Sequence, residues 1–210
     1  MFYDRFLFAI VLLVLGLQTG GCVTPNGALP VPLSKTVDVG DQYMGIRLLG
    51  TLRLPTDRVK GLTFGGISGL AWDKDEQILY ALSDLGRVFH LRPMIVDKRL
   101  VDVEILNVHH LKDVKGRKLV KPWKDAEDLT LRNAANGIKG DSELIVCFEV
   151  KQRIRRYTNT GKRLGGYELP KHLRSIRHFA NPNIALEAIT LHPRWGLLVA
   201  PEWPTHGGRH

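Results

Sequence analysis

The sequence reads ISGLAW at residues 67–72, and the same pattern returns as AEDLTL at residues 126–131 and LEAITL at residues 186–191. Each hexamer has apolar residues at its fourth and sixth positions, an alternation typical of a half-buried β-strand. Turn-forming residues and a second apolar stretch follow each hexamer: ILYALS at 78–83, LIVCFE at 144–149 and LLVAPE at 197–202. The units recur at intervals of 59 and 60 residues, which predicts a repeated two-strand module.

Further strands are expected between consecutive modules. Short apolar stretches lie at residues 88–91 and 101–105 after the first module, and at residues 154–157 and 166–169 after the second. Four antiparallel strands in each repeat are typical of propeller blades. We therefore expect an all-β fold, a β-propeller. A solenoid and a β-sandwich are the alternative architectures, but a sandwich gives no reason for acidic residues to recur at the same two strand positions.

The repeats are fewer than a closed propeller requires. Propellers close with about four to eight blades, whereas this sequence supplies material for about two and a half four-stranded blades before it ends at His210. We therefore expect residues 43–210 to form an incomplete propeller domain that is truncated at its C-terminus. Its open edge strands would favour aggregation or assembly with another chain.

The first 22 residues are expected to be a lipoprotein-type signal peptide. Arg5 precedes an apolar run at residues 6–17, which as a helix would span about 18 Å and is too short to cross a bilayer core of about 30 Å. The run leads to Thr-Gly-Gly-Cys, which resembles a lipobox and makes Cys22 the predicted lipidation site. Ordinary cleavage with release and an uncleaved anchor are the alternatives. Residues 23–42 are expected to be a flexible tether.

The chain carries a net charge of +9, with an isoelectric point near 9.7. In a cytosolic protein this excess would suggest nucleic acid as a partner, but the signal peptide places the chain outside the cytosol, and no nucleic acid partner is expected. We expect an exported protein of the cell envelope or periplasm, held to the membrane through its N-terminal lipid anchor. Phosphorylated or other anionic small molecules are the expected ligands of its basic residues.

Acidic residues recur at two positions of the module. Glu127 and Glu187 are second in their hexamers, Glu149 and Glu202 end the second strands, and Asp84 follows the second strand of the first module. In a propeller these strand ends converge on the central channel, where crowded carboxylates raise one another's pKa unless a cation is bound. Calcium accepts oxygen ligands in variable geometry. The sequence therefore predicts a metal site formed by these five residues.

A simpler interpretation of the same glutamates is that they accept hydrogen bonds from backbone amides of a neighbouring blade or pair with arginines. Lys151 and Arg153 closely follow Glu149 and are the candidates for binding a phosphate near the metal. The catalytic residues stay unknown, because the sequence has no GxSxG nucleophile motif. Zinc is not expected, since the histidines and cysteines lack its ligand spacing. Cys147, in an apolar run, is expected to be a buried, inert thiol.

At these modules the sequence resembles the phytase-like family (esterase-like activity of phytase), a family of exported β-propeller proteins. The matching blocks are GGISGL at 65–70, YALSD at 80–84, DAEDL at 125–129, FE at 148–149, RI at 153–154, LP at 169–170, NIALEAI at 183–189 and APE at 200–202. The chain departs from the family pattern at Asp128, Ala185 and Ala188, where glycine is usual.

The resemblance implies a calcium-dependent hydrolase of phosphoric esters, with phytate or a related compound as substrate and calcium on the channel carboxylates. There are two other hypotheses. One is that the chain is a non-catalytic propeller lipoprotein that presents a binding surface at the cell envelope. The other is that it is a truncated fragment without activity. Hydrolysis that depends on a metal separates the first hypothesis from the other two.

Overall fold

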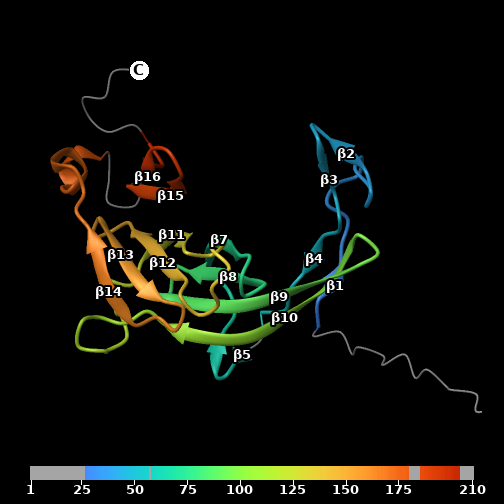
Figure 1. The fold of residues 1–210 in the computed structure, drawn as a ribbon, viewed down its shortest axis with the longest axis horizontal. Coiled ribbons are helices and arrows are strands. Elements are labelled where there is room, and N and C mark those ends of the chain that lie inside the picture. Colours follow the sequence, from blue (N-terminus) through green and yellow to red (C-terminus); the bar gives the residue numbers. More distant parts are fainter. Residues whose placement is uncertain (1–26, 57, 180–184, 204–210) are drawn as a thin grey trace, which may run out of the picture.

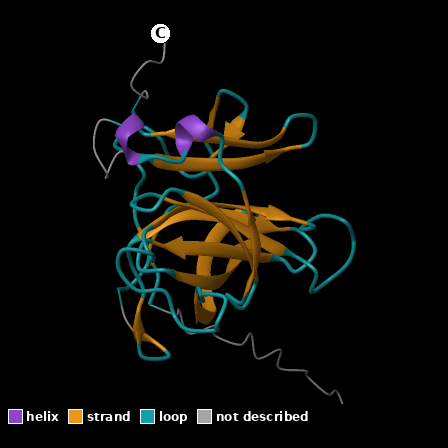
Figure 2. Cartoon of the chain, turned by 90° about the vertical axis from the view of Figure 1, so that its left-hand side faces the viewer, coloured by secondary structure: helices purple, strands orange, loops and turns teal. Residues whose placement is uncertain are grey.

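The fold was analysed in a computed structural model, which describes residues 27–203 apart from residue 57 and residues 180–184. The expected signal peptide, residues 1–22, and the predicted lipidation site Cys22 lie outside the described residues. Antiparallel sheets dominate the described part of the chain (Figures 1 and 2). Within that part, no helix is long and apolar enough to cross a membrane.

Three antiparallel sheets follow one another along the chain, and their sequential strands are hydrogen-bonded neighbours. The first sheet consists of β7 (Ile67–Asp73), β8 (Ile78–Ser83), β9 (Arg87–Val96) and β10 (Arg99–His110). The second consists of β11 (Ala126–Arg132), β12 (Glu143–Phe148), β13 (Arg153–Thr158) and β14 (Arg163–Tyr167). The third consists of β15 (Leu186–His192) and β16 (Gly196–Pro201).

These sheets confirm the all-β prediction and the strands that the repeats indicated. The two four-stranded sheets and the two-stranded third sheet are consistent with a propeller-like arrangement. The hexamers form β7, β11 and β15, and in the first two sheets the hexamer strand is an edge strand. We call these three the inner strands. β9 and β10 extend well beyond the predicted residues and form a long hairpin (Figure 1).

The inner strands lie beside one another, with β11 between β7 and β15. Side chains join them to neighbouring backbone: the Ser68 hydroxyl donates to the carbonyl oxygen of Ala126 at 2.7 Å, and Asp128 Oδ2 accepts from the Ile189 N–H at 2.9 Å. Each inner strand therefore begins near the beginning of the inner strand beside it. This arrangement positions the acidic residues described below.

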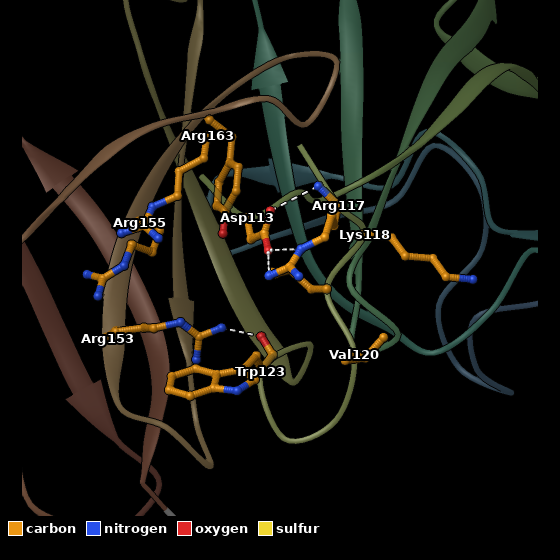
Figure 3. Close-up of a pocket in the computed structure, with 10 residues that line it drawn as sticks. Asp113, Arg117, Lys118, Val120, Trp123, Arg153, Arg155 and Arg163 are labelled. Carbon is orange, nitrogen blue, oxygen red and sulfur yellow. Dashed lines mark hydrogen bonds and ion pairs between the residues drawn. The ribbon is translucent and has the colours of Figure 1, made fainter. Parts of the chain in front are cut away.

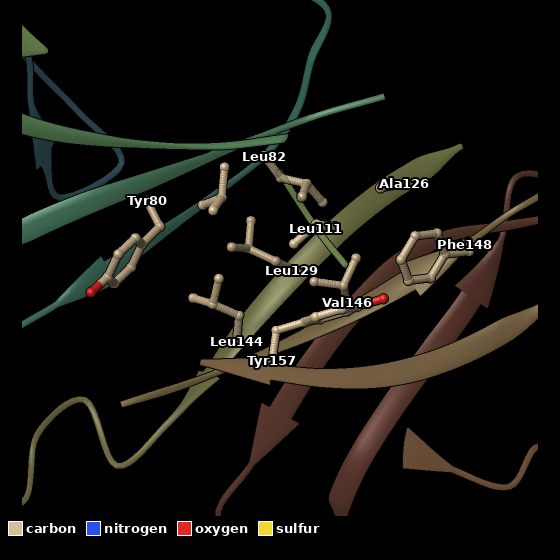
Figure 4. Packing of buried hydrophobic residues seen from close by; sticks show 10 residues of the cluster. Tyr80, Leu82, Leu111, Ala126, Leu129, Leu144, Val146, Phe148 and Tyr157 are labelled. Atoms are coloured by element: carbon tan, nitrogen blue, oxygen red, sulfur yellow. The ribbon is translucent and has the colours of Figure 1, made fainter. Parts of the chain in front are cut away.

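Two of the three hydrophobic clusters found among the described residues lie on the two faces of the second sheet, and the third lies on the first sheet. Leu144, Val146 and Phe148 of β12 pack towards the first sheet, while Ile145 and Cys147 pack towards the third. Because both faces of β12 are covered, its sequence is continuously apolar rather than alternating. The cluster between the first and second sheets (Figure 4) is formed by Tyr80, Leu82, Val88, Leu111, Ala126, Leu129, Leu144, Val146, Phe148 and Tyr157.

Cys147 is fully buried, and it is the free cysteine of the described residues. Burial raises the pKa of its thiol to about 12, so the thiol stays protonated at neutral pH. A reactive cysteine requires the thiolate. The prediction of an inert, buried thiol is therefore confirmed.

Short paired strands precede the first sheet, and two single-turn 3₁₀ helices connect the second sheet to the third. The N-terminal pairs are β1 (Leu29–Pro30) with β4 (Leu52–Arg53), β2 (Gln42–Tyr43) with β3 (Ile46–Arg47), and β5 (Arg58–Val59) with β6 (Leu62–Thr63). The 3₁₀ helices are η1 (Lys171–Leu173) and η2 (Ile176–His178). The segment expected as a tether, residues 23–42, is described from residue 27 onwards and includes β1 and the first residue of β2, Gln42.

Candidate metal centre

A β-bulge occurs at the same position of each inner strand. The strand pairing shifts by one residue at Ser68 in β7, at Glu127 in β11 and at Glu187 in β15. A bulge leaves one residue unpaired and redirects its side chain. The same backbone feature therefore directs the side chain at the second position of the hexamer in all three modules. In two of the modules that side chain is a glutamate.

The other repeated position directly follows the second strand of each module. Asp84 follows β8, Glu149 follows β12 and Glu202 follows β16. Each backbone N–H donates to the carbonyl oxygen of the residue before the hexamer, at 2.9, 3.3 and 3.0 Å for the acceptors Gly66, Asp125 and Ala185. The three residues are thus structurally equivalent, and they lie at the same end of their sheets as the bulges.

Two groups of three carboxylates form where the second and third sheets meet. Asp125, Glu127 and Glu149 offer oxygen atoms that all lie within 4.8 Å of one another, and Glu149, Glu187 and Glu202 do the same. We call these two groups the carboxylate clusters. Glu149 belongs to both, and it is almost fully buried. Its Oε1 accepts a hydrogen bond of 3.2 Å from the Ala185 N–H of the third module.

Crowding and burial favour the protonated forms of these acids. Burial, followed by the charges of Glu149, Asp125, Asp84 and Glu202, raises the pKa of Glu127 to about 7. Burial also raises the pKa of Glu187 to about 8, and the Glu187 carboxyl is further held protonated because it donates a hydrogen bond to Glu149. Metal-free, the clusters therefore retain protons at neutral pH.

The donor set fits a hard divalent cation. Every charged donor is a carboxylate oxygen, the ligand type that calcium prefers. The ion pairs found among the described residues join Arg92 to Glu104, Arg117 to Asp113, Arg156 to Glu143 and Arg174 to Glu168, so none of them neutralises the carboxylate clusters. The acidic groups could therefore hold a metal ion. Among the described residues these glutamates are not paired with arginine, whereas Glu149 accepts a hydrogen bond from a backbone amide of the neighbouring module.

Four of the five acids named from the sequence lie in the carboxylate clusters: Glu127, Glu149, Glu187 and Glu202. Asp84 is in neither cluster, although its charge contributes to the raised pKa of Glu127. Asp125 was missed by the sequence analysis. Its equivalents are Gly66 and Ala185, so the comparison of repeats gave no signal there. What could have indicated Asp125 is its position directly before the hexamer that carries Glu127.

Lys151 and Arg153, the predicted phosphate-binding residues, both contact Trp123 rather than the carboxylate clusters. The Arg153 guanidinium lies 3.7 Å from the centre of the Phe148 ring and 5.3 Å from that of Trp123. It donates hydrogen bonds to the carbonyl oxygens of Lys151 and Trp123. Lys151 Nζ lies 5.9 Å from the centre of the Trp123 ring. Arg153 is nearly buried, so its immediate role is to fix the turn after β12.

Comparison with known proteins gave one family. The family model described as Phytase-like, esterase-like activity of phytase, matches residues 62–209. This range begins at β6 and takes in all three sheets and both carboxylate clusters. No curated protein matches the chain significantly. The chain belongs to the phytase-like family.

Proposed function

We propose that the chain is an exported hydrolase of phosphoric esters that depends on calcium bound at the carboxylate clusters. Membership of the phytase-like family supports an esterase-like activity. The observation that carries the proposal is Glu149, a buried carboxylate shared by two groups of acids that lack a positively charged partner among the described residues. We also propose that the three sheets are blades of a β-propeller, with β7, β11 and β15 along its channel.

Each acid of the carboxylate clusters has a role in the proposed site. Glu149 would hold calcium from the centre, with Asp125 and Glu127 on one side and Glu187 and Glu202 on the other. When bound, calcium would neutralise the phosphate ester and lower the pKa of water. The raised pKa of Glu127 belongs to the metal-free cluster, and bound calcium would lower it and favour the ionised carboxylate. In the metal-free chain, the hydrogen bond from Glu187 to Glu149 orients the two carboxyl groups.

Hydrolysis of 4-nitrophenyl phosphate tests this proposal. We expect activity that chelator abolishes and added calcium restores, and that Glu149→Gln and Glu187→Gln largely remove. Glu104→Gln is the matched control, because Glu104 lies outside the clusters in an exposed ion pair with Arg92. Activity that is indifferent to chelator and to Glu187→Gln would contradict the proposal. Turnover of 4-nitrophenyl acetate alone would instead identify a carboxylic esterase.

A binding role without turnover is the second candidate function. Leu70 and Trp72 of β7 are 57% and 45% exposed, and Leu191 of β15 is 38% exposed. Together they line a shallow hollow over the inner strands. Contiguous exposed apolar side chains are typical of interaction surfaces. This function predicts no hydrolysis of any ester together with saturable capture of a partner that Trp72→Ser abolishes.

We further propose that the protein is exported and lipid-anchored at Cys22, in the cell envelope. The apolar run at residues 6–17 and the cysteine that follows it support this. Radiolabelled palmitate should be incorporated by the expressed chain and not by a Cys22→Ser variant, which should move from the membrane fraction to the soluble fraction. Equal labelling of both chains would refute lipidation at this residue.

A further inference from the structure

A second hollow, of about 660 Å³, lies away from the carboxylate clusters. It is enclosed by the segment between β10 and β11 on one side and by β13 and β14 of the second sheet on the other (Figure 3). None of the clustered acids lines it. Its volume is within the range of small-molecule sites, roughly 300 to 1,000 Å³. The residues that matter for its chemistry are Arg117, Trp123, Arg153, Arg155, Tyr157 and Arg163.

Three arginines form one wall of this hollow. Arg153 and Arg155 share a face of β13 because side chains alternate along a strand. Arg163 of β14 is paired with Tyr157, the next residue on that face. Figure 3 shows the three arginine side chains one above another. Burial lowers the pKa of Arg155, and the nearby charge of Arg163 lowers it further. The wall therefore concentrates positive charge.

The acidic residue that lines the hollow already has an ion-pair partner and hydrogen-bond donors. Asp113 is the acidic residue among the described residues that line it. Its Oδ2 accepts from Arg117 Nε and Nη2, each at 2.8 Å, and its Oδ1 accepts from the backbone N–H groups of Lys115 and Arg117 at 2.8 and 2.9 Å. These bonds, above all those from Arg117, lower the pKa of Asp113. Asp113 therefore does not balance the opposite wall.

Arg155 and Arg163 have no acidic partner in the part of the chain that the structure describes. The Arg155 guanidinium donates to the backbone carbonyl oxygen of Ile154 at 2.9 Å. Arg163 Nε is buried and has no hydrogen-bond partner among the described residues. A buried donor left without an acceptor is destabilising, because it has lost its hydrogen bonds to water. An anion in the hollow would supply both the missing acceptor and the missing charge.

Apart from Lys118 and the Asp113–Arg117 pair, the rest of the lining is largely apolar, which restricts the ligand further. Leu119, Val120 and Trp123 line the hollow, and Figure 3 shows Val120 opposite the arginines and the Trp123 ring beneath Arg153. Two guanidinium groups without acidic partners among the described residues match the two negative charges of a phosphate monoester better than the single charge of a carboxylate. Guanidinium binds phosphate through paired hydrogen bonds. We propose that this hollow binds an organic phosphate, with its phosphate on Arg155 and Arg163 and its apolar body against Trp123 and Leu119. This site is separate from the proposed calcium site and does not depend on it.

Titration with phenylphosphonate in calcium-free buffer with chelator tests the site. The P–C bond of this probe is not an ester, so the proposed hydrolase activity does not consume it. We expect saturable binding by calorimetry, with a change of tryptophan fluorescence that Trp123→Phe removes. An Arg155→Gln, Arg163→Gln double variant should weaken binding roughly tenfold or more, as expected for the loss of charge-assisted hydrogen bonds. Arg58→Gln, at an exposed arginine outside the hollow, should bind like the unaltered protein.

Three outcomes would overturn this site: no saturable binding, unchanged affinity in the double variant, or benzoate bound as tightly as phenylphosphonate. If circular dichroism shows that the double variant is unfolded, Arg163→Lys takes its place. That variant keeps the charge but loses the guanidinium fork, so weaker binding is expected, and unchanged affinity would refute the assignment. Glu187→Gln should leave phenylphosphonate binding intact, which separates failure of this site from failure of the proposed hydrolase.

Discussion

Glu149 is the residue on which the candidate site depends. Its carboxylate is almost buried, accepts hydrogen bonds from the Ala185 amide and the Glu187 carboxyl, and belongs to both carboxylate clusters. It therefore couples the second module to the third. The sequence indicated Glu149 through its repeat position, but its burial and its hydrogen bond to Ala185 depend on how two modules pack, which a single strand pattern does not determine.

The raised pKa values of Glu127 and Glu187 predict how metal-free stability varies with pH. Both lie above the ordinary value of 4.5, at about 7 and about 8, so the folded state binds more protons than the unfolded state across that interval. Their contribution to stability is complete below the unfolded pKa and is lost as the pH rises through the folded pKa. The metal-free Tm should therefore fall between about pH 5 and pH 8.

Calcium should reverse this trend, because it favours the ionised carboxylates. Differential scanning calorimetry is expected to show a larger Tm increase on calcium addition at about pH 8 than at about pH 5. Glu187→Gln, which cannot ionise, should reduce the pH dependence of the metal-free Tm. An equal calcium effect at both pH values would show that the clustered acids are not the groups that calcium stabilises.

At the scale of elements, the hexamers were predicted correctly as strands, whereas their bulges were not foreseen. Ala126 and Leu129 of β11 are both buried although they are three residues apart. A regular strand would place them on opposite faces, and the bulge at Glu127 allows both to face the core. Leu186 and Ile189 of β15 repeat this spacing. The spacing of three positions between these apolar residues is visible in the sequence, but a search for strict alternation does not detect it.

The short N-terminal strands were not predicted for a different reason. Each of the strands β1 to β6 has two residues, which is too few to show a period in the sequence. The positions of β9 and β10 were indicated by their apolar centres, but the hairpin continues through exposed Ile95 and Val96, where the apolar pattern gives no boundary. Pairing between the two strands, not burial, sets that length.

Close contact between inner strands predicts a strong effect of Gly69→Ala. A Cβ at Gly69 would lie 2.5 Å from Asp128 Oδ1 and 3.0 Å from the Asp128 Cα on β11. Overpacking of this kind is expected to lower the free energy of unfolding by about 1–3 kcal/mol. Urea unfolding measures it. Gly165→Ala is the matched control, because a Cβ there meets nothing within 4 Å, and equal stability of the two variants would contradict the close packing of β7 and β11.

At the scale of the whole molecule, the first two sheets have four strands each and the third is a two-stranded hairpin. The number of strands in each sheet followed from the sequence, because the repeat period and the apolar stretches within each repeat indicated it. How the inner strands approach one another did not follow, because it depends on contacts such as Ser68 to Ala126 and Asp128 to Ile189. Those contacts join residues about 60 positions apart, beyond the reach of local patterns.

The exposed apolar side chains of β7 predict association of the purified chain. Leu70 and Trp72 are largely exposed on the inner strands, and exposed apolar patches promote association. A Leu70→Ser, Trp72→Ser double variant should remain monomeric at protein concentrations where the unaltered chain associates, as measured by multi-angle light scattering. Leu33→Ser, at an equally exposed leucine of the N-terminal segment, should not change the association. A monomeric unaltered chain would count against this prediction.

Calorimetric titration of calcium into the chelator-treated chain is the most direct test of the proposed metal centre. The structure predicts saturable binding for the unaltered chain and for Glu104→Gln, and its loss in Glu149→Gln, since Glu149 is common to both groups of carboxylates. Absence of calcium binding in the unaltered chain, or undiminished binding in Glu149→Gln, would contradict a metal site built on this residue.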